Sequence, residues 1–109
     1  MKKTDKKIDN AIRGALTEVC DKALEEHDGF MWLTHRVDYQ NIPASLSITC
    51  VFDTNEQLSN THVDDLRVII KNKLASIAIY INDSRQTVRF DTEENCTKEH
   101  KGNWQQRLN

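Results

Sequence analysis

The stretch that decides the predicted fold is FMWLTHRVDYQNIPASLSITCVFDT, residues 30–54. Its second half, residues 44–53, alternates apolar with mostly polar side chains, which is the period-two pattern of a strand with one buried face. Residues 30–39 show a similar alternation, and the segment between the two contains Pro43, which is typical of a loop. We therefore predict an antiparallel hairpin with one solvated face.

The end of this hairpin is repeated 38 residues later. Thr49–Glu56 reads TCVFDTNE and Thr87–Glu94 reads TVRFDTEE, so five of eight positions are identical. Residues 86–90 predict a short strand around this second copy. Residues 76–81, in which isoleucine alternates with alanine and tyrosine, predict the strand before it, with a continued helix as the alternative. The two Phe-Asp-Thr endings then mark equivalent ends of equivalent strands.

Two segments have the three- and four-residue apolar spacing of amphipathic helices. The first is Thr4–His27. Thr4 is its candidate N-cap, and Gly29 can end the helix by adopting the left-handed backbone conformation. The second follows a cap at Thr54 or Thr61, and its apolar stripe consists of Val63, Leu66, Ile70 and Leu74.

The predicted fold is therefore an α+β two-layer domain in the order α-β-β-α-β-β. Two helices would cover one face of a mostly antiparallel four-stranded sheet. We expect this single domain to occupy residues 1–95. Residues 96–109 would form a polar C-terminal tail that only Trp104 and Leu108 can anchor.

Composition narrows the class of protein. The 109 residues are 38% apolar and 29% charged, with a formal net charge of −2, so there is no overall attraction to DNA or to anionic membranes. No apolar run is long enough to span a bilayer. The odd number of cysteines, three, favours reduced thiols in a cytoplasmic protein.

Catalytic motifs are scarce in the sequence. It has no glycine-rich phosphate loop, no G-x-S-x-G elbow and no evident cysteine–histidine pairing, so we expect a non-enzymatic protein and predict no cofactor. The first functional hypothesis is a non-enzymatic binding or regulatory module. Trp32 and Arg36, on the solvated face of the hairpin, are the candidate residues for a protein interface or a ligand, with base stacking as the alternative.

Self-association is part of this hypothesis. The apolar stripe of residues 4–27 is long for so small a chain, and its simplest role is to cover the sheet. Apolar surface left over from that role would favour pairing with a second copy, which makes a homodimer the expected partner.

Nucleic-acid binding is the alternative function. Its candidate residues are basic and lie at the start of the first predicted helix: Lys2, Lys3, Lys6, Lys7 and Arg13. Such a cluster binds phosphates in a salt-dependent way.

A metal-dependent phosphoester hydrolase is the second alternative. If the repeated strand ends are neighbours, their carboxylates can converge and hold Mg²⁺ or Mn²⁺. The candidates are Asp53, Glu56, Asp91, Glu93 and Glu94. The simpler interpretation is that these residues close strands and cap helices while staying solvated, so no metal site is predicted.

Short segments along most of the chain resemble a family of small bacterial proteins that often carry the label "Fis family transcriptional regulator". They are Thr4–Asn10, Asp28–Phe30, Cys50–Thr54, Phe90–Glu94 and Gly102–Trp104. The resemblance implies a bacterial cytoplasmic protein and supplies no catalytic residues. The Fis protein itself ends in a helix-turn-helix, whereas residues 80–109 here predict a strand and a polar tail.

Overall fold

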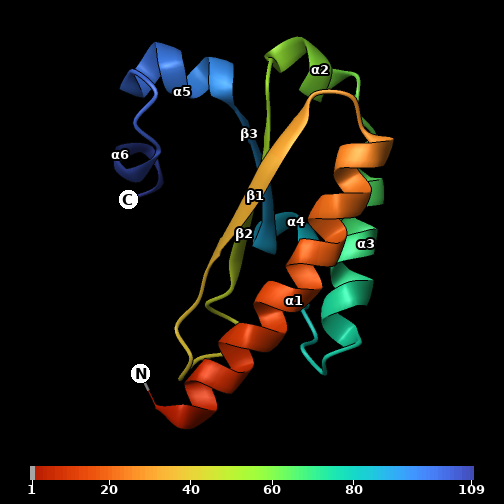
Figure 1. The fold of residues 1–109 in the computed structure, drawn as a ribbon, viewed down its shortest axis with the longest axis vertical. Coiled ribbons are helices and arrows are strands. Elements are labelled where there is room, and N and C mark those ends of the chain that lie inside the picture. The colour runs from red at the N-terminus through yellow and green to blue at the C-terminus, as the bar shows by residue number, and fades with distance from the viewer. Residues whose placement is uncertain (1) are drawn as a thin grey trace.

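The computed structural model describes residues 2–109 and shows an α+β protein with a three-stranded sheet (Figure 1). Helices and strands follow one another along the chain as α1 Lys3–Glu26, β1 Phe30–Arg36, β2 Ser47–Phe52, α2 Asn55–Ser59, α3 Val63–Ala75, α4 Ser84–Thr87, β3 Val88–Thr92, α5 Glu93–His100 and α6 Trp104–Leu108. None of these helices has the length and hydrophobicity needed to cross a lipid bilayer.

The sheet is mixed, with β2 at its centre. β1 pairs antiparallel with β2, so the predicted hairpin is confirmed, and Thr34 lies opposite Thr49. β3 pairs parallel with β2, and Thr49 lies opposite Arg89. A parallel pair needs a long crossover connection, and here α2, α3 and α4 provide it.

The predicted four-stranded, mostly antiparallel sheet with two helices is wrong, because residues 76–81 pair with no strand. α3 ends at Ala75, and Ala78 has a positive φ of 63°, which interrupts an extended run. Ile79 and Ile81 are nevertheless buried while Tyr80 is exposed. The alternation in this segment therefore comes from alternate side chains entering the core and not from a hydrogen-bonded ladder.

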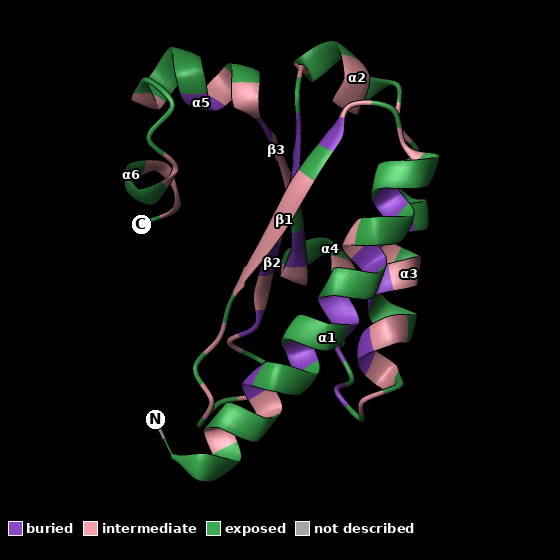
Figure 2. Cartoon of the chain, viewed as in Figure 1, coloured by how far each residue is buried: buried purple, intermediate pink, exposed green. Residues whose placement is uncertain are grey.

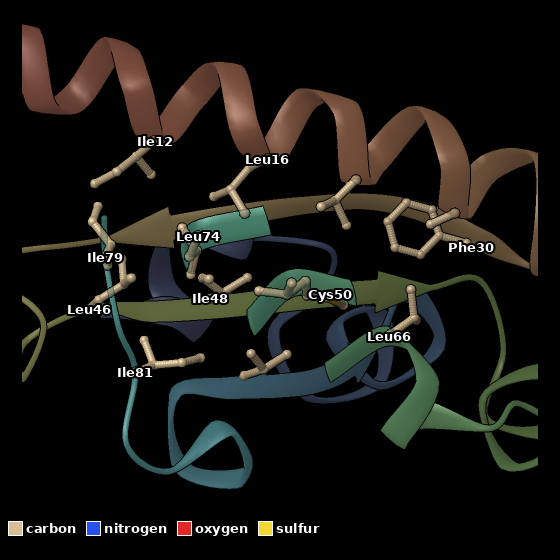
Figure 3. Packing of buried hydrophobic residues seen from close by; sticks show 14 of the residues in the cluster. Ile12, Leu16, Phe30, Leu46, Ile48, Cys50, Leu66, Leu74, Ile79 and Ile81 are labelled. Atoms are coloured by element: carbon tan, nitrogen blue, oxygen red, sulfur yellow. The ribbon is translucent and has the colours of Figure 1, made fainter. Parts of the chain in front are cut away.

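α1 and α3 cover one face of the sheet and enclose the core. The apolar stripe of α1 lies against β1 and α3, and the stripe predicted for the second helix is confirmed in α3. Figure 3 shows Ile12 and Leu16 of α1 facing Ile48 and Cys50 of β2 across this core. Ile12, Ile48 and Cys50 are completely shielded from solvent. Each such aliphatic side chain contributes about 1.5–3 kcal/mol on burial.

The repeated Phe-Asp-Thr sequences occupy equivalent places where a strand passes into a helix. The side-chain hydroxyl of Thr54 accepts a hydrogen bond from the backbone N–H of Gln57 at 3.1 Å and so caps α2. The hydroxyl of Thr92 accepts one from the backbone N–H of Asn95 at 3.0 Å and caps α5. Because β2 and β3 are adjacent and parallel, both helices begin at the same end of the sheet (Figure 1). The predicted order α-β-β-α-β-β is wrong, however, since only one strand, β3, follows β2.

Gly29 turns the chain from α1 into β1, as the sequence predicts. Its φ is +86°, and a Cβ atom at this position would lie 2.4 Å from the side-chain oxygen of Gln57. Both the backbone angle and the close approach of α2 therefore require glycine.

The C-terminal segment lies on the opposite side of the sheet from α1 and α3 (Figure 1). The expected boundary between residues 95 and 96 falls inside α5, and Cys96 is fully buried. Figure 2 shows that α5 and α6 are otherwise mostly exposed or half-buried, in contrast to the buried stripes of α1 and α3. α6 has no buried residue, and it contacts the sheet through the Arg107–Asp91 ion pair and the packing of Trp104 against Trp32.

Candidate ligand-binding cleft

The face of the sheet turned away from α1 and α3 is lined mainly by polar side chains. Successive residues of a strand point to opposite faces, and residues directly opposite each other share a face. Thr34, Thr49 and Arg89 therefore form one row across all three strands, and Arg36 lies opposite Ser47 in the next row of β1 and β2. We call this surface the open face.

A cleft of about 630 Å³ lies between the open face and the C-terminal helices. This volume is within the roughly 300–1,000 Å³ typical of small-molecule sites. The strands contribute Thr34, Arg36, Ser47, Thr49, Arg89 and Asp91, and the C-terminal segment contributes Glu99, His100, Arg107 and Leu108.

Arg107 ties α6 to the sheet on one side of the cleft. Its guanidinium donates two hydrogen bonds to the carboxylate of Asp91, at 2.5 Å from Nε to Oδ2 and 3.1 Å from Nη2 to Oδ1, and it also contacts Glu99. Burial is the largest influence on the pKa of Asp91 and raises it. The hydrogen bonds from Arg107, from the backbone amide of Thr92 and from Asn95, together with the charge of Arg107, offset burial and leave that pKa below its ordinary value. Arg107 therefore has a structural role, and its charge is already paired with Asp91 and Glu99.

Arg36 and Arg89 are the less committed cations of the cleft. Arg36 donates one hydrogen bond, at 2.6 Å, to the carbonyl of Leu108, and a guanidinium carries five N–H donors. Arg89 is exposed and has no ion pair or side-chain hydrogen bond to another residue between 2 and 109. The hydroxyls of Thr34, Ser47 and Thr49 likewise bond no other residue in the described chain, which leaves donors and acceptors free on the cleft floor.

Trp32 packs against Trp104 at the edge of the open face. The two ring centroids are 4.9 Å apart and the planes are nearly perpendicular. Both indole N–H groups donate to Glu93, Trp32 at 2.7 Å and Trp104 at 3.2 Å. Trp32 and Arg36, the predicted interface or ligand residues, thus lie on one face as expected, where Trp32 contacts the chain's own C-terminal segment and Arg36 borders the cleft.

The acidic residues of the repeated strand ends do not converge. Asp53 and Glu56 are exposed, Asp91 is paired with Arg107, and Glu93 accepts from the two tryptophans. Glu94 accepts a hydrogen bond from the Asn55 amide at 2.8 Å, at the start of α2. Across residues 2–109, no three His, Cys, Asp or Glu side chains are grouped so that they could hold a metal ion.

The basic cluster divides into two parts. The four lysines, Lys2, Lys3, Lys6 and Lys7, are exposed at the start of α1. Arg13 instead donates to Asp9 at 2.7 Å, and Tyr39 donates to the same carboxylate at 2.5 Å. The Tyr39 hydrogen bond and then that of Arg13 lower the pKa of Asp9. Arg13 is therefore part of a half-buried network that fastens α1 to the loop after β1.

The cysteines are free, as the odd count predicts. Cys50 and Cys96 are buried and Cys20 is half-buried. Burial raises the pKa of the Cys50 thiol to about 12, so this group stays protonated and acts as a small apolar side chain.

Sequence reasoning missed Arg89, Arg107 and the hydroxyl floor of the cleft. The alternation of apolar and polar residues along β1, β2 and β3 could have indicated Thr34, Thr49 and Arg89 as residues of the solvated face, because each occupies a solvated position of its strand. No local pattern connects Arg107 with Asp91, which are 16 residues apart.

In comparisons with known proteins, no protein-family model, no curated protein and no solved structure gives a match to this chain.

Proposed function

We propose that this protein is a non-enzymatic binding or regulatory module whose ligand site is the cleft between the open face and α5–α6. The observation that carries the proposal is a concave surface of small-molecule size whose floor has unpaired hydroxyls and whose border has two arginines with free donors. Hydroxyl and guanidinium groups orient a ligand through hydrogen bonds. The carboxylate of Asp91 is held ionised by Arg107, which favours binding over proton transfer.

The test uses four compounds of similar shape: benzoate, phenyl phosphate, benzamide and benzamidine. Each is titrated into the full chain while backbone amide resonances are followed by NMR. We expect at least one to produce saturable shifts at Thr34 and Thr49. The variant Thr49→Trp, which fills the cleft, should abolish these shifts. Thr97→Trp, on the exposed side of α5, should leave them unchanged. Failure of all four compounds to shift cleft residues contradicts the proposal.

Nucleic-acid binding is a second candidate, supported by the exposed lysine cluster at the start of α1 and by the resemblance to proteins labelled as regulators. It requires salt-sensitive binding that disappears when Lys2, Lys3, Lys6 and Lys7 are changed to alanine. Because phosphate contacts strengthen as salt is lowered, no binding to DNA or RNA at about 50 mM salt would exclude it.

Self-association is a separate proposal about the same module. The stripe of α1 is largely used by the core, and large apolar side chains left exposed include Leu24 on α1 and Met31 on β1, at 52% and 46%. These two are the candidate contacts with a second copy. Sedimentation that stays monomeric at all concentrations would count against a dimer. A cytoplasmic location, consistent with three free thiols, completes the proposal.

A further inference from the structure

We propose that the cleft recognises a small ligand through an anionic oxygen group, a carboxylate or a phosphate, which Arg89 and Arg36 bind above the hydroxyls of Thr34, Ser47 and Thr49. This inference rests on the proposed function, because it names the class of ligand for the same cleft.

The first argument is the charge of the lining. The cleft is bordered by three arginines and two carboxylates, so its charged side chains are net positive by one. The whole chain carries a net charge of −2. The cleft is therefore a positive site on a negative protein, and the excess charge belongs to Arg36 and Arg89, because Arg107 already binds Asp91 and Glu99. A concave surface with a net charge raises the local concentration of ligands of the opposite sign.

The second argument is the placement of the donors. Arg36 lies on one outer strand and Arg89 on the other, with the hydroxyls of Ser47 and Thr49 on the central strand between them. Adjacent strands are about 4.8 Å apart, so long arginine side chains from both outer strands can reach a group over β2. Guanidinium forks match the paired oxygens of carboxylates and phosphates, and such charge-assisted bonds are the strong ones.

The third argument concerns the size of the ligand. α6 borders the open face, where Arg107 pairs with Asp91 and Arg36 donates a hydrogen bond to the carbonyl of Leu108. The C-terminal helices thus bound the cleft on one side, and its volume of about 630 Å³ suits a small molecule.

The experiment compares the four compounds on three proteins. Benzoate and benzamide have nearly the same shape, so charge is the main difference between them, and phenyl phosphate separates phosphate from carboxylate as the preferred group. We expect benzoate or phenyl phosphate to bind at least about tenfold more tightly than benzamide. Arg89→Gln should weaken that binding by about tenfold or more, since it removes charge-assisted hydrogen bonds. Arg85→Gln, an exposed arginine on α4 outside the cleft, is the matched control and should bind like the parent.

Different outcomes separate this inference from the proposed function. If benzamide or benzamidine binds the cleft as tightly as benzoate, or if Arg89→Gln and Arg85→Gln behave alike, the anionic class is wrong while the cleft stays a binding site. If no compound shifts cleft residues, both statements fall. A single-stranded oligonucleotide that displaces benzoate from Thr34 and Thr49 would overturn the choice of a small molecule. Amide spectra of the free variants check that each is folded before its binding is compared.

Discussion

Ile48 and Thr49 are neighbours on β2, yet they belong to two surfaces with different physical roles. Ile48 is completely buried beneath α1 and α3, whereas Thr49 lies half-buried on the floor of the cleft. The helix-covered face contains nearly the whole apolar core. The open face contains hydroxyls, arginines and one ion-paired carboxylate. Stability is thus concentrated on one side of the sheet, which leaves the other side free to hold polar groups suited to a ligand.

The largest expected difference between the faces comes from substituting these two neighbours. Ile48→Ala should lower the free energy of unfolding by about 2–5 kcal/mol, because it removes apolar contacts and leaves a cavity. Thr49→Val keeps the β-branched shape and should change the free energy of unfolding by no more than about 0.5 kcal/mol. Urea denaturation measures both. Equal losses for the two variants would show that the open face is also part of the stabilising core.

Two ion pairs allow a second comparison between the faces. Arg107→Gln should lower the free energy of unfolding by about 1–3 kcal/mol, because Asp91 is left half-buried without its partner. Lys73→Gln breaks the pair with Glu18 between α3 and α1, where the side chains are 37% and 65% exposed, and should cost less than about 1 kcal/mol.

Arg107→Gln should also release α6 from the sheet, which Lys73→Gln should not do. Trp32 and Trp104 are the only tryptophans of the chain, so a red shift of their fluorescence in Arg107→Gln reports loss of the α6 contact. Unchanged fluorescence in that variant would mean that Arg107 does not hold α6.

Lowering the pH should reduce the free energy of unfolding through protonation of Asp9 on one side of the sheet and of Asp91 on the other. The pKa of each carboxyl group is lowered from its ordinary value of 3.8, so each is protonated more easily in the unfolded chain. Their contribution to stability is complete above pH 3.8 and is lost as the pH falls through the lower folded-state pKa. Urea midpoints between pH 5 and pH 2 should therefore fall less steeply in Asp91→Asn than in the parent. Parallel slopes would show that Asp91 is not coupled to folding.

A smaller effect than that of Ile48→Ala is expected for Trp104→Phe. Phenylalanine keeps an aromatic ring against Trp32 but removes the 3.2 Å N–H bond to the Glu93 carboxylate, and hydrogen bonds to charged groups contribute about 1.5–3 kcal/mol. Glu93 keeps its bond from Trp32, so the loss should fall at the low end of this range. A loss as large as that of Ile48→Ala would make the α6 contact as important to stability as the core.

The sequence was sufficient to predict α1, α3 and the β1–β2 hairpin, because each buries one face and the period of its apolar residues reports the local geometry. The same reasoning failed for residues 76–81. Ile79 and Ile81 alternate with exposed residues, but alternation records which side chains are buried and cannot show whether the backbone pairs with a strand.

The candidate site was harder to predict than the core. Trp32 and Arg36 were selected as candidate interface residues on the solvated face of the hairpin. That placement depends only on the local alternation of apolar and polar residues. The partners that complete the site come from the far end of the chain: the carbonyl of Leu108 is 72 residues from Arg36. Contacts of this separation depend on how the parallel β3 brings the C-terminal segment back over the sheet, and hydrophobic periodicity carries no information about that arrangement.

The most direct test of the binding role of the open face is a set of intermolecular nuclear Overhauser effects between the ring protons of benzoate and the methyl groups of the protein. The account predicts contacts to the methyl groups of Thr34 and Thr49, and their loss in Arg89→Gln at the same benzoate concentration. Contacts to methyl groups on α1 or α3 instead, or no contacts at concentrations that saturate the amide shifts, would contradict it.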